Sequence, residues 1–221
     1  MHAHTRTTRF GAALATATAA VTLISATPAT AAPATSPAVP GSVSAHPAGA
    51  VPAATDGVDY GVWQRDVAVA VAAARSYLEE RTSARPGERR AIVLDIDNTS
   101  LETDFHHFWE FPTPAVRPVL ELARYAKSRG TDVFFVTARP GILHAPTVLN
   151  LRAVGFPVAG VYVRDLPDLF EEVSAYKTAS RADIEAKGYT VIANIGNRPT
   201  DLVGGHAERT FKLPDYDGAL S

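Results

Sequence analysis

Two carboxylates separated by one residue follow an apolar run near the middle of the chain. The stretch AIVLDIDNTSL (91–101) carries four apolar residues straight into Asp95 and Asp97. A strand that merely ends does so with Gly, Asn or Ser, or with a single Asp that caps a following helix. Because charged side chains are seldom buried without partners, the closely spaced pair indicates chemistry rather than packing.

Polar side chains that can bind phosphate or metal also follow the other apolar runs. A hydroxyl, a guanidinium, an ammonium, an amide and a further carboxylate all occur at or just past such runs. These residues are Thr137 and Arg139, with Ala138 between them, after the run at 131–136, Lys177 near the start of a later helical segment, and Asn197 and Asp201 after the run at 190–196.

The inventory suits phosphoryl transfer. One carboxylate can attack phosphorus and form an aspartyl-phosphate, while a second carboxylate two residues away protonates the leaving oxygen and later deprotonates water. Two neighbouring carboxylates can hold different protonation states because each raises the pKa of the other. A metal ion and Lys177 must offset the repulsion between the nucleophile and the phosphate dianion. Since the chain has no Cys and offers oxygen ligands, Mg²⁺ is the expected ion.

The segments around these residues alternate between helix and strand patterns. Continuous apolar runs predict buried strands at 91–97, 131–138, 158–164 and 190–196, with a last short strand at 209–214. Helices are predicted at 58–83, 114–130, 145–156 and 174–189. This alternation predicts the α/β class, a single Rossmann-like parallel sheet with helices on both faces. Ligands bind such sheets outside the carboxyl ends of the strands, where the polar residues should converge.

The first 55 residues differ in composition from the rest of the chain. Arg6 and Arg9, the apolar run at 11–26 and the small residues that follow predict a secretory signal peptide over 1–31. The alternative is an Ala-rich disordered tail. The Pro- and Ala-rich stretch 32–55 predicts a linker, and 56–221 then forms one domain. The expected location is outside the cell, where the linker could hold the domain away from a cell wall.

Composition also bears on the partners. The net charge is −2 with no basic stripe, which argues against a nucleic-acid partner. The apolar run is too short and too rich in Ala and Thr for a convincing membrane span, so no integral membrane segment is expected in the mature protein. Small phosphorylated substrates are the expected partners, and the sequence gives no indication of an oligomeric state.

Four motifs in order resemble those of the haloacid dehalogenase (HAD) superfamily of phosphatases. They are DIDNT at 95–99, VFFVTARP at 133–140, the Lys helix that begins YKTAS at 176–180, and GNRPTD at 196–201. The chain is most similar to the secreted acid phosphatases that include the plant vegetative storage proteins. In that subfamily Thr147, Asn150, Leu151 and Gly155, and the stretch GGHAERTFKLP at 204–214, also have counterparts.

The resemblance implies a role for each motif. Asp95 would be nucleophile and metal ligand, and Asp97 the acid and base, with its backbone carbonyl also on the metal. Thr137 and Lys177 would bind the phosphate, together with the neighbouring Ala138 and Arg139. Arg139 could equally be an ion-pair partner on the rim. Mg²⁺ would be held by Asp95, Asp97, Asn197 and Asp201.

Asn197 departs from the pattern of the secreted group, which usually has Asp at this position. An amide oxygen can still bind Mg²⁺, but the site has one less negative charge. The expected function is a secreted, Mg²⁺-dependent acid phosphatase acting on phosphate monoesters. One alternative is a catalytically weak phosphate-binding or storage-type protein of the same fold. Another is a lipid phosphatase, because GNRPTD also resembles the motif of lipin-type enzymes.

Two further features concern access to the site. The segments that could carry a cap are used by the predicted helices and strands, so we expect no large cap domain and an open site. His106 and His107 lie beside aromatic residues in HHFWEF (106–111). We expect this segment to pack as a flap and line the substrate entrance rather than bind metal.

Overall fold

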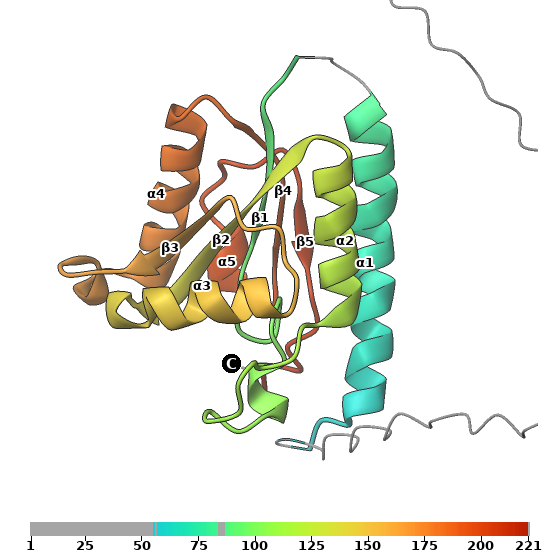
Figure 1. Cartoon of the computed structure of the whole chain (residues 1–221), viewed down its shortest axis with the longest axis vertical. Coiled ribbons are helices and arrows are strands. Elements are labelled where there is room, and N and C mark those ends of the chain that lie inside the picture. Colours follow the sequence, from blue (N-terminus) through green and yellow to red (C-terminus); the bar gives the residue numbers. More distant parts are fainter. Residues whose placement is uncertain (1–54, 56, 84–86, 221) are drawn as a thin grey trace, which may run out of the picture. The chain divides into compact units, whose positions relative to one another are not determined.

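Five apolar runs form one parallel sheet in the computed structural model, which describes residue 55 and residues 57–83 and 87–220. The strands lie side by side in the order β3-β2-β1-β4-β5 (Figure 1). The order confirms the predicted α/β class and places the strand that precedes Asp95 at the centre of the sheet. The strands are β1 (Arg90–Leu94), β2 (Thr131–Pro140), β3 (Gly160–Arg164), β4 (Thr190–Gly196) and β5 (Thr210–Lys212).

Helices cover both faces of the sheet, as the alternation predicts. Buried residues of α1, α2 and α3 share one apolar cluster with β1 and β2, and α4 packs on the other face in a second cluster. The helices are α1 (Tyr60–Ser83), α2 (Arg117–Ser128), α3 (His144–Ala153), α4 (Val173–Ala186) and α5 (Pro199–Leu202), with short 3-10 turns η1 (Thr103–Phe105), η2 (Gly141–Leu143) and η3 (Asp168–Phe170).

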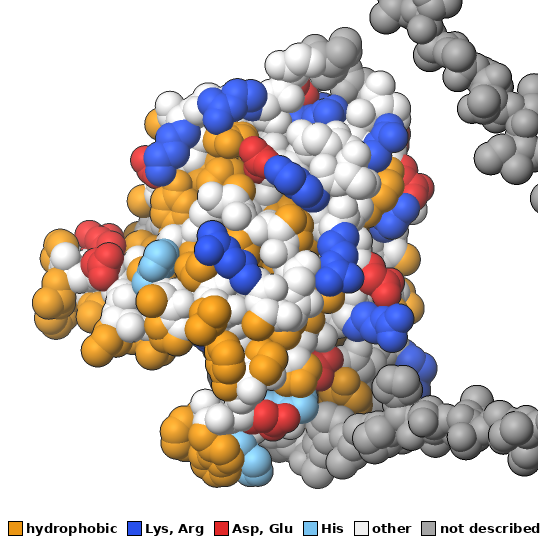
Figure 2. Space-filling model, in the orientation of Figure 1, with side chains coloured by type: hydrophobic (Ala, Val, Ile, Leu, Met, Phe, Trp, Pro, Cys, Tyr) orange, Lys and Arg blue, Asp and Glu red, His pale blue; other side chains and the backbone are white. Residues whose placement is uncertain are grey.

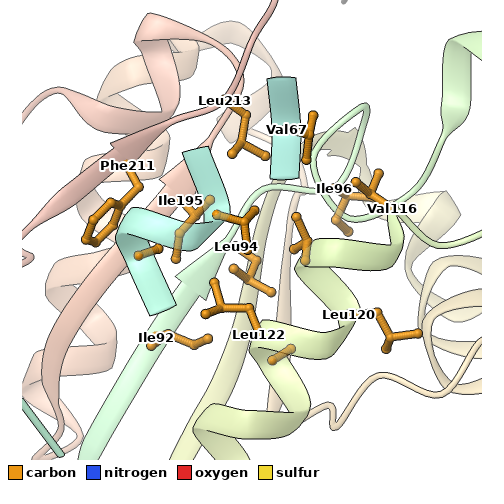
Figure 3. Packing of buried hydrophobic residues seen from close by; sticks show 14 of the residues in the cluster. Val67, Ile92, Leu94, Ile96, Val116, Leu120, Leu122, Ile195, Phe211 and Leu213 are labelled. Atoms are coloured by element: carbon orange, nitrogen blue, oxygen red, sulfur yellow. The ribbon is translucent and has the colours of Figure 1, made fainter. Parts of the chain in front are cut away.

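The larger cluster fixes the position of the central strands. Figure 3 shows Ile92 and Leu94 of β1 packed between α2 and the α1 helix, close to Ile195 of β4. The side chains of Ile92 and Leu94 are fully buried, and burial of a Leu or Ile side chain contributes about 1.5–3 kcal/mol to the stability of the fold. The carboxyl end of β1 therefore has little freedom to move relative to its neighbours.

The structure corrects several predicted boundaries. β1 ends at Leu94 rather than at residue 97, because the carbonyl of Ile96 accepts hydrogen bonds from the amides of Thr99, Ser100 and Leu101 in a tight turn. Helix α2 begins at Arg117 rather than at 114, with Pro118 in its first turn. Helix α5 was not predicted, since four residues are too few to show a helical period.

No cap domain interrupts the described part of the chain. The segments that follow β1, β2 and β3 contain only the short turns η1, η2 and η3 before the next helix. No helix among the described residues is long and apolar enough to cross a membrane. The predicted signal peptide (1–31) and all but the last residue of the predicted linker (32–55) lie outside the described residues.

Replacement of Trp63 tests the contact between α1 and the rest of the domain. Trp63 is fully buried and stacks on Phe105 with 4.5 Å between ring centroids. We expect Trp63→Ala to lower the free energy of unfolding by about 3–5 kcal/mol, measured by urea denaturation. Val69→Ala, on an exposed position of the same helix, should change it by less than about 0.5 kcal/mol. Equal effects of the two substitutions would contradict this packing.

Candidate active site

The carboxylate of Asp95 lies at the carboxyl edge of the sheet, directly after β1. Its backbone is held on both sides: its amide donates to the carbonyl of Ile195 at 3.0 Å, and its carbonyl accepts from the Ser100 hydroxyl at 2.6 Å. The side chain faces a cavity of about 300 Å³. This cavity is lined by Asp95, Asp97, Ala138, Val173, Lys177, Asn197, Arg198, Thr200 and Asp201.

Lys177 of α4 joins the two buried carboxylates of the cavity. Its Nζ atom donates to Oδ1 of Asp95 and to Oδ1 of Asp201, each at 2.6 Å. All three side chains are less than 10 % exposed. Three residues from distant parts of the chain therefore form one ionic cluster.

Burial and charge act in opposite directions within this cluster. Burial raises the pKa of Asp95 above its usual range; Lys177 offsets part of that rise and Asp201 adds to it. Burial alone would lower the pKa of Lys177, but Coulomb attraction to Asp95 and Asp201 raises it above the ordinary value. The amine of Lys177 therefore stays charged.

Arg139 holds the carboxylate of Asp97. Its guanidinium donates from Nη2 to Oδ1 at 2.6 Å and from Nε to Oδ2 at 3.0 Å, the bidentate geometry of strong ion pairs. Its remaining nitrogen donates to the Thr147 hydroxyl of α3 at 3.1 Å, and the Thr103 hydroxyl also donates to Asp97. The structure thus shows Arg139 as the ion-pair partner that the sequence left as one of two possibilities.

Thr99 and Asn197 connect the first and fourth motifs. The backbone amide of Asn197 donates to Oγ1 of Thr99 at 3.0 Å. The Thr99 hydroxyl in turn donates to the side-chain oxygen Oδ1 of Asn197 at 3.3 Å. Both residues are fully buried. Between Asp97 and Thr99, Asn98 adopts a left-handed backbone conformation (φ 51°), which turns the chain back over the strand end.

Asp201 is fixed by a buried arginine that the sequence analysis did not single out. Oδ2 of Asp201 accepts the backbone amide of Arg198 at 2.8 Å and caps the short helix α5. The guanidinium of Arg181 donates to the carbonyls of Asp201, Val203 and Gly205 and is 1 % exposed. Arg181 stands four residues after Lys177 on α4, and this i, i+4 spacing was the sequence signal that could have identified it.

The predicted residues of the second motif divide between the cavity and its wall. Ala138 lines the cavity, whereas Thr137 and Arg139 do not. Thr137 is fully buried, and its Oγ1 accepts the backbone amide of Arg139 at 3.2 Å. The structure therefore brings Asp95, Asp97, Lys177, Asn197 and Asp201 to one cavity, with Thr137 and Arg139 directly beside it.

The oxygen atoms at the cavity fit a hard divalent cation. Among the residues that line the cavity, such a cation would take the carboxylates of Asp95 and Asp201, the side-chain amide oxygen of Asn197 and, as the resemblance implies, the backbone carbonyl of Asp97. Oδ1 of Asp95 binds Lys177, while no donor from the described residues binds Oδ2. Nowhere in the described part of the chain do three His, Cys, Asp or Glu side chains gather closely enough to hold a metal. Neutral oxygens are therefore needed to complete a Mg²⁺ site here.

His106 and His107 take part in separate contacts. His106 lies between two carboxylates, 3.3 Å from Glu102 and 3.1 Å from Glu110. His107 stacks on the Trp109 ring at 4.4 Å between centroids. Both contacts lie in or beside the segment that follows η1, and its role as a flap over the substrate entrance stays a prediction.

Apolar side chains gather on the loops that follow β1 and β3. Figure 2 shows them as orange groups on the two loops that project at the lower end and at the left of the view. These side chains, with one on η2 after β2, are more than half exposed: Phe108, Trp109, Phe111, Ile142, Leu166 and Phe170. Because these loops follow β1 and β3, two strands of the same parallel sheet, they stand at the sheet edge that carries the cavity.

Comparison with known proteins identifies the family to which the sequence belongs. A family model described as HAD superfamily, subfamily IIIB (acid phosphatase) matches residues 13–219. The stem 28 kDa glycoprotein of Glycine max is 32% identical over 106 residues, which are 46% of this chain and 42% of that protein. Acid phosphatase 1 of Solanum lycopersicum is 30% identical over 104 residues, 46% of this chain and 41% of that protein. Vegetative storage protein 1 of Arabidopsis thaliana is 31% identical over 104 residues, 47% of this chain and 38% of that protein. The matches thus span less than half the length of these relatives.

Solved structures show the same fold. The class C acid phosphatase from Bacillus anthracis superposes with a TM-score of 0.57 at 16% sequence identity, over 73% of this chain and 83% of that chain. The structure of a class C acid phosphatase from Bacillus anthracis with tungstate bound gives a TM-score of 0.56 at the same identity and coverage. At this identity the likeness concerns the fold.

Removal of the Lys177 charge tests the buried cluster. Because burial raises the pKa of Asp95, ionisation of Asp95 becomes a cost to the folded state as the pH rises above the unfolded value. Lys177→Met must enlarge this cost. We expect the metal-free variant to lose about 3–5 kcal/mol of unfolding free energy at pH 7, measured by urea denaturation in EDTA.

The same loss should shrink toward pH 4, where the carboxylates bind protons. The exposed Lys127→Met, which breaks a surface ion pair with Asp132, serves as control and should cost less than about 1 kcal/mol. A loss for Lys177→Met that does not change with pH would count against the electrostatic explanation.

Proposed function

The chain belongs to the HAD superfamily, subfamily IIIB, the acid phosphatases, and on this premise we propose that it is a Mg²⁺-dependent phosphomonoesterase. The observation that carries the proposal is the contact of Asp95 with Lys177 at the carboxyl end of the central strand β1, with 2.6 Å between Oδ1 and Nζ. A buried carboxylate held beside a charged amine, in a cavity lined by further oxygens, matches the requirements for attack on a phosphate.

In the proposed first step, a carboxylate oxygen of Asp95 forms a bond to phosphorus and the bond from phosphorus to the ester oxygen breaks. The carboxyl group of Asp97 gives its proton to the departing oxygen, so the alcohol leaves neutral. Lys177 donates to the phosphate oxygens and offsets their repulsion by Asp95. The product on the protein is an aspartyl-phosphate.

In the second step, Asp97 takes a proton from water while the water oxygen attacks phosphorus. The bond between phosphorus and Asp95 breaks, and phosphate and the Asp95 carboxylate are regenerated. Arg139 and Thr103 fix the orientation of the Asp97 carboxylate for both proton transfers. Mg²⁺ held by Asp95, Asp201, Asn197 and the backbone carbonyl of Asp97 would draw charge from the phosphate oxygens.

A phosphate-binding or storage role is the second candidate. Its support is the similarity to a vegetative storage protein and the amide at position 197 in place of a carboxylate. The two functions separate on turnover, because a binding protein retains phosphate affinity without releasing phosphate from esters.

We also propose that the protein is exported. The support is the basic start, the apolar run and the small residues of 1–31. Expression of the full chain in a Gram-positive host should give a secreted product that begins near residue 32, as determined by mass spectrometry of the medium. A product in the cell that retains residues 1–31 would contradict export.

Phosphate release from p-nitrophenyl phosphate tests the proposed activity. We expect turnover with Mg²⁺, none with EDTA, and a loss of at least about 10³-fold in kcat for Asp95→Asn or Asp97→Asn. Asp183→Asn, a half-exposed position of α4 away from the cavity, should retain the full rate. Absence of turnover in the unsubstituted protein, with phosphate still bound, would favour the storage role.

Phosphatidate vesicles in the same assay address the lipid alternative. The exposed apolar residues on the loops after β1, β2 and β3 favour a substrate whose alcohol part is apolar. However, the loop after β3 carries Asp165, Asp168, Glu171 and Glu172, which repel an anionic membrane surface. We therefore expect soluble esters to be hydrolysed faster than phosphatidate in vesicles.

A further inference from the structure

The amide side chain of Asn197 is enclosed between two elements from opposite ends of the domain sequence. On one side, Oδ1 accepts the Thr99 hydroxyl at 3.3 Å. On the other side, Nδ2 donates to the backbone carbonyl of Leu220 at 3.4 Å. Asn197 is fully buried and also lines the cavity that carries Asp95. The residue thus connects the cavity with the C-terminal segment 213–220.

The carbonyl of Leu220 determines which way the amide faces. A carbonyl oxygen accepts hydrogen bonds and cannot donate one, so the atom turned toward it must carry hydrogen. The same oxygen accepts Nη1 of Arg198 at 3.4 Å, which shows that donors converge on it. The NH₂ group of Asn197 therefore faces Leu220, and its oxygen faces Thr99.

The position of this carbonyl is fixed by the fold of the segment. The Leu220 side chain is fully buried in the larger apolar cluster. Its amide donates to the carbonyl of Asp215 at 3.1 Å, and Tyr216 of the same turn donates to Asp66 of α1 at 2.7 Å. The carbonyl is thus presented to Asn197 by a structured turn that packs against the domain.

We propose that the backbone carbonyl of Leu220 is a positioning group of the site, which specifies an amide rather than a carboxylate at position 197. An Asp there would place a buried, charged oxygen opposite the Leu220 oxygen, with no hydrogen between them. This accounts for the residue in which the chain departs from the usual acidic motif. The missing negative charge is then a consequence of how the C-terminal segment closes the site.

The pairing of Asn197 with Leu220 has two consequences. The metal arm of the test, Mg²⁺ affinity, rests on the proposed function, whereas the folding arm, stability without metal, does not. If the amide is held with its oxygen toward Thr99 and the cavity, the Leu220 carbonyl contributes to the affinity for Mg²⁺ without touching the ion. Leu220 therefore acts through Asn197, as a positioning residue, and the pairing can be measured in metal-free protein.

Thermal unfolding of the full chain in EDTA tests the folding arm. We expect Asn197→Asp to lower Tm by about 2–4 °C or more at pH 7, because it buries an unpaired charge. Deletion of Ser221 turns the Leu220 carbonyl into a terminal carboxylate while retaining every described residue. This deletion should enlarge the fall in Tm caused by Asn197→Asp, because two anions then face each other. It should leave the Tm of the protein with Asn197 unchanged, because the side-chain amide donates equally to a carbonyl and to a carboxylate.

Leu220→Ala is the matched control, since it removes the buried side chain and keeps the carbonyl. Its own Tm falls, but Asn197→Asp should cost as much in this background as in the full chain. The pairing is refuted if Asn197→Asp is as stable as the parent, or if deletion of Ser221 leaves its loss unchanged.

Calorimetric titration with Mg²⁺ tests the metal arm. A chain that ends at Gly218 lacks the carbonyl and should bind Mg²⁺ several-fold more weakly than Leu220→Ala, which keeps it. Equal affinities would refute the positioning role even if the truncated chain is less stable. If the unsubstituted protein binds no Mg²⁺, the proposed metal dependence fails, whereas the unfolding data still decide the pairing of Asn197 with Leu220. Should the truncated chain not fold, the Ser221 deletion still decides the pairing of Asn197 with Leu220 by thermal unfolding.

Discussion

The ammonium of Lys177 compensates two carboxylates that the sheet edge brings together out of water. Without a cation between them, Asp95 and Asp201 would repel each other in a medium that screens charge poorly. The elements around the cavity maintain this balance: α4 supplies the lysine, β1 ends at Asp95, and α5 presents Asp201 through its backbone cap.

Buried polar residues outside the cavity keep the charged groups in position. Arg181 binds three carbonyls of the segment after α5 and so fixes Asp201. Helix α3 has a comparable role on the other side: Thr147 accepts from Arg139, and Asn150 one turn later binds both the amide and the carbonyl of Thr113. The motif that contains Thr147 and Asn150 thereby supports both Arg139, the partner of Asp97, and the chain at Thr113. Precise placement of a few reacting groups depends on such supporting contacts.

The strand pattern predicted most of the charged and amide residues that line the cavity, because these residues follow the carboxyl ends of parallel strands. In a parallel sheet, Asp95 after one strand and Asn197 after another must meet at the same edge, whatever lies between them in sequence. The prediction was less complete where a residue acts through its backbone neighbours. Helix α5 has no distinctive local pattern. The i, i+4 spacing places Arg181 on the same face of α4 as Lys177, but it does not show which groups Arg181 contacts, since a buried arginine and a solvated one look alike in sequence.

The sequence by itself determined the α/β class, the order of the motifs and the residue types that gather at the cavity, because these depend on periodicity and on the ends of strands. Tertiary structure alone decided how these groups pair. The ion pair of Arg139 with Asp97 depends on the distance between two strand ends, and the contact of Asn197 with Leu220 joins residues 23 positions apart. Pairing energies depend on distance and burial, and both are set by the packing of the whole domain.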